Sequence, residues 1–301
     1  MKKTIRFLNK SIVFITFLLN RPSYFLPDKI YIKRTYYRKT KQRINLKNPS
    51  LYNEKMQWIK LYDRQPFYSD LVDKYKVRNY VAQIIGEEYL IQNYGVWDTF
   101  DEIPFDKLPN EFVLKCTHDC GSVVICKDKA TFDFQKSRKF FKKQLAKNYY
   151  WKHREWLYKN IKPRILAEKL MVDESGVELK DYKIYCFHGE PKVIGIYFGR
   201  FSGEKPKGNF YTPQWEFLNL KTGLKNDPNL IIEKPEWLDK ALLLARQLSK
   251  GKIHVRVDFY IVENKIYFGE LTFYEDAGFI RFEPPEWNQI FGDWMKLPIA
   301  D

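Results

Sequence analysis

The sequence predicts an α+β fold, because helical and strand patterns occupy separate stretches of the chain and the strands come in adjacent pairs joined by turns. Apolar residues recur at helical spacing in residues 50–100 and 237–248, whereas strand pairs are indicated in residues 112–126, 182–198 and 254–272. At 301 residues, the chain is long enough for one large domain or two lobes with an apolar core.

The first half of the chain begins with helices and continues into strands. Residues 50–100 carry two apolar stripes at helical spacing, and Gly86 ends the second. A linker with two prolines follows in residues 101–110. Strands are then expected at 112–116 and 122–126, around a short loop.

Residues 133–160 are rich in lysine and aromatic residues, and two interpretations remain open. The alternation of aromatic and basic residues in 148–158 is similar to a stacking platform for nucleic acid. One or two amphipathic helices that bury Tyr149, Trp156 and Leu157 explain the same pattern. We favour the helices and expect no nucleic-acid partner.

The second half is dominated by strands. Residues 164–198 show the pattern strand, turn, strand, and residues 199–230 indicate a long loop or short extra strands. An amphipathic helix over residues 237–248 ends near Gly251, and a last short helix opens at residues 284–287.

The most informative strand pair is a hairpin formed by residues 254–261 and 265–272. Its first strand alternates cleanly, with His254, Arg256, Asp258 and Tyr260 on the polar face.

A three-residue loop, 263–265, would pair Val262 with Ile266, place Asp258 directly opposite Glu270, and make Arg256 face Thr272. Opposed carboxylates repel each other unless a cation lies between them, and oxygen ligands of this kind suit Mg²⁺. The hairpin is therefore predicted to form half of a Mg-nucleotide site.

Two alternatives to this metal hairpin remain open. In an ordinary hairpin, Asp258 and Glu270 face solvent or pair with Arg256 and nearby lysines. A two-residue loop at 263–264 would place Asp258 and Glu270 on opposite faces of the sheet.

Two lysines lie within predicted strands, Lys115 in residues 112–116 and Lys183 in residues 182–187. A lysine in a half-buried strand either pairs with a carboxylate or binds an anion, because an unpaired buried ammonium group is costly. Gly121 and Ser122, in the loop after Lys115, would let the backbone approach a phosphate.

Five motifs in order along the chain resemble the ATP-grasp fold. They are Asp73-Lys-Tyr-Lys-Val-Arg78, Phe112-Val-Leu-Lys115, Ile165-Leu-Ala-Glu168-Lys-Leu-Met171, Asp181-Tyr-Lys183, and Arg256-x-Asp258 with Glu270-x-Thr272. Thr272 stands where that family usually has Asn. The series is most similar to the TupA-like ATP-grasp family of bacterial polysaccharide-biosynthesis loci, over residues 28–298.

The resemblance implies two α+β lobes that grip a nucleotide between antiparallel sheets, preceded by a helical N-terminal segment. The corresponding boundaries are an N-terminal arm at 1–27, a helical region at 28–110, a small nucleotide lobe at 111–171, and a catalytic lobe with the metal hairpin at 172–301.

The resemblance also implies roles for individual residues, with ATP and Mg²⁺ as cofactors. It implies that Asp258, Glu270 and Thr272 bind the metal ion and that Arg256 and Lys183 are catalytic residues. Nucleotide binding falls to Lys115, Gly121, Ser122, Glu168, Lys169, Met171, Asp181 and Lys183, with residues 168–171 at adenine and Asp181 at the ribose or supporting Lys183.

The expected function is a Mg·ATP-dependent carboxylate–amine ligase that modifies a uronic-acid-containing capsular or cell-surface polysaccharide. Its partners are then ATP, a polysaccharide or lipid-linked saccharide acceptor, and an amino acid or other amine. Three alternatives remain: a sugar kinase of the same fold, a glycosyltransferase, and a non-enzymatic basic module that binds membrane or nucleic acid. The chain contains no Asp-x-Asp, which disfavours the glycosyltransferase.

The charge is concentrated at the N-terminus. Residues 1–50 contain 13 Lys and Arg and only one acid, Asp28, which accounts for +12 of the net +15. The apolar run 12–19 is shorter than the ~20 residues that a spanning helix needs. We expect the arm to lie at an anionic membrane surface, with a docked arm and a signal peptide as alternatives.

Four cysteines without a Cys-x-x-Cys spacing do not form a disulfide framework in a chain of this length. Reduced cysteines agree with a cytoplasmic, ATP-using protein, peripheral at the inner face of the plasma membrane.

Overall fold

A computed structural model describes residues 22–173, 179–199 and 206–298. Its helices are α2 (Asp28–Thr40), α3 (Tyr52–Tyr62), α4 (Tyr68–Val72), α5 (Val77–Ile84), α6 (Phe134–Leu145), α7 (Tyr150–His153), α8 (Leu238–Ser249) and α9 (Trp287–Trp294). Short 3₁₀ helices are η1 (Pro22–Phe25), η2 (Glu87–Tyr89), η3 (Phe100–Glu102), η4 (Trp156–Tyr158) and η5 (Glu275–Gly278).

The strands form two larger sheets and one small one. In chain order they are β1 (Asn93–Trp97), β2 (Phe112–Cys116), β3 (Val123–Cys126), β4 (Ile165–Glu168), β5 (Asp181–Phe187), β6 (Glu190–Phe198), β7 (Lys207–Tyr211), β8 (Phe217–Leu218), β9 (Lys221–Thr222), β10 (His254–Val262), β11 (Lys265–Thr272) and β12 (Phe282–Glu283). The four-stranded sheet has the order β1-β4-β2-β3, the six-stranded sheet the order β11-β10-β5-β6-β7-β8, and β12 pairs with β9. All of these pairings are antiparallel.

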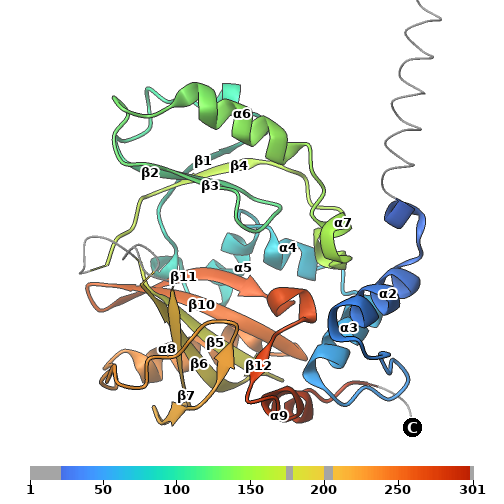
Figure 1. Ribbon diagram of the computed structural model, residues 1–301. Coiled ribbons are helices and arrows are strands. Elements are labelled where there is room, and N and C mark those ends of the chain that lie inside the picture. The colour runs from blue at the N-terminus through green and yellow to red at the C-terminus, as the bar shows by residue number, and fades with distance from the viewer. Residues whose placement is uncertain (1–21, 174–178, 200–205, 299–301) are drawn as a thin grey trace, which may run out of the picture.

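The four-stranded sheet and α6 form one lobe, which Figure 1 shows above the six-stranded sheet. Alternate residues of β2 and β4, among them Leu114 and Ala167, are fully buried in a core that also contains Phe141 of α6. This alternation leaves Lys115 on the other face of the sheet, toward the second lobe.

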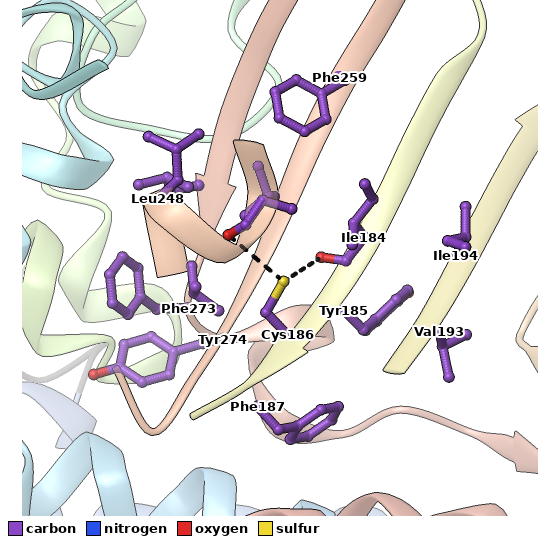
Figure 2. Close-up of a cluster of buried hydrophobic side chains, with 14 of the residues drawn as sticks. Ile184, Tyr185, Cys186, Phe187, Val193, Ile194, Leu248, Phe259, Phe273 and Tyr274 are labelled. Carbon is purple, nitrogen blue, oxygen red and sulfur yellow. Dashed lines mark hydrogen bonds between the residues drawn. The ribbon is translucent and has the colours of Figure 1, made fainter. Parts of the chain in front are cut away.

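The six-stranded sheet carries α8 on one face. The apolar stripe predicted for this helix is buried against β5 and β10, and β10 contributes Val257 and Phe259 to the same core. Figure 2 shows Cys186 in this cluster, with its thiol near the carbonyl oxygens of Ile184 and Ala245 at 3.7 and 4.0 Å. Because this face is fully apolar, the polar residues of β10 all project from the other face.

The predicted α+β class with antiparallel sheets is confirmed. Residues 50–100, which were predicted to be helical, differ from that prediction in two respects. The second apolar stripe is divided into α4 and α5, because the Asp73 carboxylate accepts the backbone N–H groups of Tyr75 and Lys76 and turns the chain between them. Residues 93–97 form β1, which pairs with β4 from far along the chain. A five-residue strand with a bulge near Gly95 is too short to show the alternation of apolar and polar residues that identifies a strand, so the sequence did not indicate β1.

No helix in residues 22–173, 179–199 and 206–298 is long and apolar enough to cross a membrane. Residues 1–21 of the predicted arm lie outside the described residues.

Candidate active site

In the hairpin of β10 and β11, Asp258 pairs with Glu270 as predicted, but the loop and the register differ from the prediction. Its loop has two residues, Glu263 and Asn264, both with positive φ, and Val262 pairs with Lys265. The prediction of a three-residue loop is therefore wrong. The register then shifts by one residue at Gly269, so that Asp258 faces Glu270 and Arg256 faces Thr272 as expected.

The bulge places a residue without a side chain against the opposite strand. A Cβ atom at Gly269 would lie 3.0 Å from the backbone oxygen of Asp258 and 3.1 Å from the Tyr260 ring. Glycine therefore allows the bulge that returns Asp258 and Glu270 to the same face.

Replacing Gly269 by alanine should disturb the bulge. We expect a loss of about 1–3 kcal/mol in the free energy of unfolding, because the added methyl group presses on backbone that cannot rotate away. Thermal unfolding measures this, with the exposed Lys265→Ala of the same strand as control. A Gly269→Ala protein as stable as the wild type would show that the bulge does not depend on glycine.

Three charged side chains form a row across β5, β10 and β11. Lys183 pairs in register with Asp258, which pairs in register with Glu270. Lys183 Nζ lies 2.6 Å from Asp258 Oδ2, and Arg256 Nε lies 2.6 Å from Asp258 Oδ1. Burial raises the pKa of Asp258, but the charges of Arg256 and Lys183 outweigh it and hold this pKa below its usual range. Asp258 is therefore ionised at neutral pH.

The oxygen atoms proposed as metal ligands converge on one point. Arg256 Nη2 lies 2.7 Å from Asp258 Oδ2, 3.0 Å from Thr272 Oγ1 and 3.1 Å from Glu270 Oε1. The cation between the two carboxylates in this structure is thus the guanidinium group. Two carboxylates and a hydroxyl, completed by phosphate oxygens and water, form the kind of donor set that Mg²⁺ takes, so the residues fit the ion. Within the described part of the chain, no three His, Cys, Asp or Glu side chains are grouped to hold a metal ion alone.

Glu275 also contacts Arg256, at Nη1, and the sequence reasoning missed it. It opens η5, where Asp276, Ala277 and Gly278 all have positive φ. Gln57 of α3 donates to the carbonyl oxygens of residues 277 and 278 at 3.1 and 2.8 Å and so holds this segment in place.

A second ion pair faces this cluster from the other lobe. Lys115 Nζ lies 2.7 Å from Glu168 Oε2, and Arg78 Nη1 lies 3.3 Å from Glu168 Oε1. Lys115 and Glu168 border a cavity of about 140 Å³ that is also lined by Glu270. The cavity thus lies between the four-stranded and the six-stranded sheet.

The structure brings only some of the predicted nucleotide-binding residues to this cavity. Its other lining residues include the predicted Gly121 and several that were not predicted, namely Lys74, Val77, Arg78, Leu90, Ile91, Cys120, Val123, Tyr260, Phe268 and Gly269. Ser122 borders a different cavity and donates to the Asp119 carboxylate. Lys169 and Met171 follow β4 outside the cavity lining, and Asp181 lies 3.4 Å from Lys183.

A larger cavity of about 490 Å³ adjoins the first. Both are lined by Lys74, Cys120, Gly269 and Glu270, and the larger one also reaches Arg256 and Thr272. Glu270 therefore stands between two chambers, one beside Lys115 and one beside Arg256.

A family model for TupA-like ATP-grasp proteins matches residues 54–296. The chain belongs to this family. Membership confirms the ATP-grasp fold and, at the superfamily level, supports an ATP-dependent ligase.

Solved structures of ATP-grasp ligases are similar at low identity. D-alanine–D-alanine ligase from Helicobacter pylori has a TM-score of 0.41 and 12% identity, covering 83% of this chain and 70% of that one. The enzyme from Bacillus anthracis complexed with ATP gives 0.37 and 15%, covering 67% of this chain, which spans only 53% of that one. The ligase PsnB with its minimal precursor gives 0.42 and 11%, covering 80% and 65%. No curated protein sequence matches the chain.

Proposed function

We propose that this protein is a Mg·ATP-dependent ligase that joins a carboxylate to an amine. The observation that carries the proposal is the cluster of Arg256, Asp258, Glu270 and Thr272, which faces the Lys115–Glu168 pair across a cavity between two sheets. The acceptor we propose is a uronic-acid-containing capsular or cell-surface polysaccharide, or its lipid-linked precursor.

The smaller cavity suits the adenine end of the nucleotide. Leu90, Ile91 and Phe268 supply apolar walls, and Glu168 supplies a polar edge. Lys115 would then contact a phosphate oxygen of the nucleotide and give up its ion pair with Glu168. The cavity is smaller than the ~300 Å³ at which ligand pockets begin, so the triphosphate must extend past Glu270 into the larger chamber.

The oxygen atoms of Asp258, Glu270 and Thr272 would hold the magnesium ion, which supplies neutralisation of the phosphate charge when it is bound. Arg256 and Lys183 already lie in contact with this oxygen cluster. Release of the guanidinium group would direct Arg256 to the larger chamber, where it stabilises the oxyanion that develops as the amine attacks the activated carboxylate.

The proposal is tested with purified protein, Mg·ATP, tri-galacturonic acid and a panel of amino acids. A ligase releases ADP and free phosphate in equal amounts and yields a product heavier by the amino acid less one water. ADP without free phosphate, together with a phosphorylated saccharide, would instead establish the kinase. Absence of nucleotide turnover with every pair of substrates would contradict the ligase.

We further propose that the protein is cytoplasmic and lies at the inner face of the plasma membrane. Support comes from α2, whose exposed side chains include Lys29, Lys33 and Arg34 beside the apolar Ile30 and Tyr37, which are 44% and 55% exposed. Apolar side chains among cations favour an anionic lipid surface, with a gain of about 1 kcal/mol per basic residue.

Deleting residues 1–25 should greatly weaken binding to phosphatidylserine vesicles, because only the exposed residues of α2 remain, and should leave ATP hydrolysis largely unchanged. Binding of the full chain should fall steeply with added salt, because exposed charges are screened. Sedimentation with vesicles measures both effects, and neutral phosphatidylcholine vesicles are the control. Equal binding by the truncated and full chains would rule out the arm as the anchor.

A further inference from the structure

The larger chamber is lined by several separate parts of the chain. They are Lys39 of α2, residues of α4 and α5 with Lys74 between them, residues 119–120, residues around α7 and η4, Arg256 of β10, β11, and the segment that contains η5. Its volume of about 490 Å³ lies within the ~300–1,000 Å³ range of small-molecule sites. Because it reaches Arg256 and Glu270, a molecule held there would touch the reacting centre proposed above.

Glu155 is one of three buried acids that line this chamber, with Asp119 and Glu275. Arg154 ends α7 with a positive φ of 56°, and this turn directs the chain into η4 with Glu155 at its start. Glu155 is 5% exposed and lines the chamber. Among the described residues, its carboxylate has no hydrogen-bond donor and no cation within ion-pair distance. A buried carboxylate without a partner is costly, so a ligand that supplies the cation would be favoured.

Three lysines that line the chamber, Lys39, Lys74 and Lys152, have no carboxylate within ion-pair distance among the described residues. Lys74 instead donates to the backbone oxygen of Asp119. Lys39 Nζ lies 4.3 Å from the centroid of the Phe279 ring, and Lys152 Nζ lies 5.3 Å from that of Tyr149. The chamber thus presents Glu155 together with Lys39 and Lys152, none of which forms an ion pair among the described residues.

We propose that this chamber binds the amine substrate as a zwitterionic amino acid, with Glu155 receiving the ammonium group and Lys39 and Lys152 the carboxylate. The inference rests on the ligase function and assigns the class and the site of its nucleophile.

The electrostatics of Glu155 suit proton transfer near neutral pH. Burial raises the pKa of Glu155 to about 7, and the charges of Lys60 and Lys152 limit the rise. Lys60 is fully buried and donates to the backbone oxygen of Ala277 at 2.5 Å. The other charged or titratable groups that line the chamber are Lys39, Lys74, Asp119, Cys120, Tyr149, Lys152, His153, Tyr158, Arg256, Glu270, Tyr274, Glu275 and Asp276. Lys60 is a further group whose charge acts on Glu155.

The step is a proton transfer followed by acyl transfer. Glu155 accepts one proton from the ammonium group, and the freed lone pair of the nitrogen attacks the acyl carbon. The new C–N bond forms as the C–O bond to phosphate breaks, and phosphate leaves with that electron pair. The second nitrogen proton passes to the departing phosphate.

Glu155→Gln tests the acid with two nucleophiles. Tri-galacturonic acid serves as the carboxylate, with either L-alanine or hydroxylamine, which is largely unprotonated at neutral pH and needs no base. We expect the variant to form hydroxamate at a rate within about threefold of the wild type, and amide about 10²-fold more slowly. Glu286→Gln, an exposed acid outside the chamber, is the matched control.

Two further measurements test the proposal independently: the pH dependence of kcat/KM, and the KM for L-alanine of a variant that lacks both lysines. Wild-type kcat/KM for L-alanine should rise through about pH 7, since the ionised carboxylate is the base, and Glu155→Gln should lose this rise. Lys39→Met with Lys152→Met should raise KM for L-alanine about tenfold and leave hydroxamate formation unchanged.

The outcomes separate the inference from the ligase function. Amide formation by Glu155→Gln at the wild-type rate would overturn the role of Glu155. Use of ethanolamine or alaninol by the wild type in preference to alanine, serine, glutamate and lysine would overturn the zwitterion assignment. A wild-type protein that forms neither hydroxamate nor amide overturns the proposed ligase, and this inference with it.

Discussion

Replacing Glu270 by glutamine is expected to abolish ATP turnover and to leave the free energy of unfolding nearly unchanged. The Glu270 side chain is 42% exposed, and its contacts within the cluster are Arg256 at 3.1 Å and Thr272 at 2.9 Å. Loss of the carboxylate removes a proposed ligand of the magnesium ion from the wall between the two chambers. A loss of about 4 kcal/mol in transition-state stabilisation corresponds to about 10³-fold in rate.

Asp258→Asn should lose turnover to the same extent and should also lose stability. Asp258 is 2% exposed and neutralises both Arg256 and Lys183, so the variant leaves two buried cations without their shared carboxylate. Breaking a buried pair in this way costs about 3–5 kcal/mol. Thermal unfolding and phosphate release, measured on both variants, test this difference. Equal stability of the two variants, or an active Glu270→Gln, would contradict the arrangement.

Nucleotide affinity should depend on Lys115 and Lys183, one from each sheet. Lys115 is 21% exposed beside Glu168, and Lys183 is 7% exposed beside Asp258, so both ammonium groups are already held in place for a phosphate. Each charge-assisted contact that is lost costs about 1.5–3 kcal/mol, which is about 10- to 150-fold in Kd. Lys115→Met and Lys183→Met should therefore each weaken binding of a non-hydrolysable Mg·ATP analogue by that factor.

Isothermal titration measures these affinities directly. Lys127→Met, an exposed lysine after β3, is the matched control and should bind as the wild type does. Unchanged nucleotide affinity in both Lys115→Met and Lys183→Met would show that the nucleotide does not bind between the two sheets.

The prediction that Asp258 faces Glu270 is correct, but it rests on two errors that cancel: a loop that is too long and a bulge that was not foreseen. The alternation of β10 identifies which residues share a face, but β11 has no clean alternation because a bulge interrupts its period. The assumed loop was one residue too long, and the bulge at Gly269 supplies the missing residue. A pattern of apolar residues fixes pairing only where both strands are regular.

Other features depend on contacts between distant segments. α8 was predictable because its whole apolar stripe packs on one sheet. The burial of Glu155, and the contact of Glu275 with Arg256, follow from η4 and η5 meeting across a chamber, which no local pattern indicates. Lys115 was recognisable as a strand lysine, yet its partner Glu168 comes from β4, two strands later in the chain.

The central claim is that ATP activates a carboxylate in the chamber beside Arg256. It is tested most directly with tri-galacturonic acid labelled with ¹⁸O in its carboxylates, incubated with Mg·ATP, L-alanine and the full chain. Activation through an acyl-phosphate transfers one labelled oxygen to the released phosphate in each turnover, which mass spectrometry detects. Phosphate that carries no label while ADP accumulates would contradict the claim.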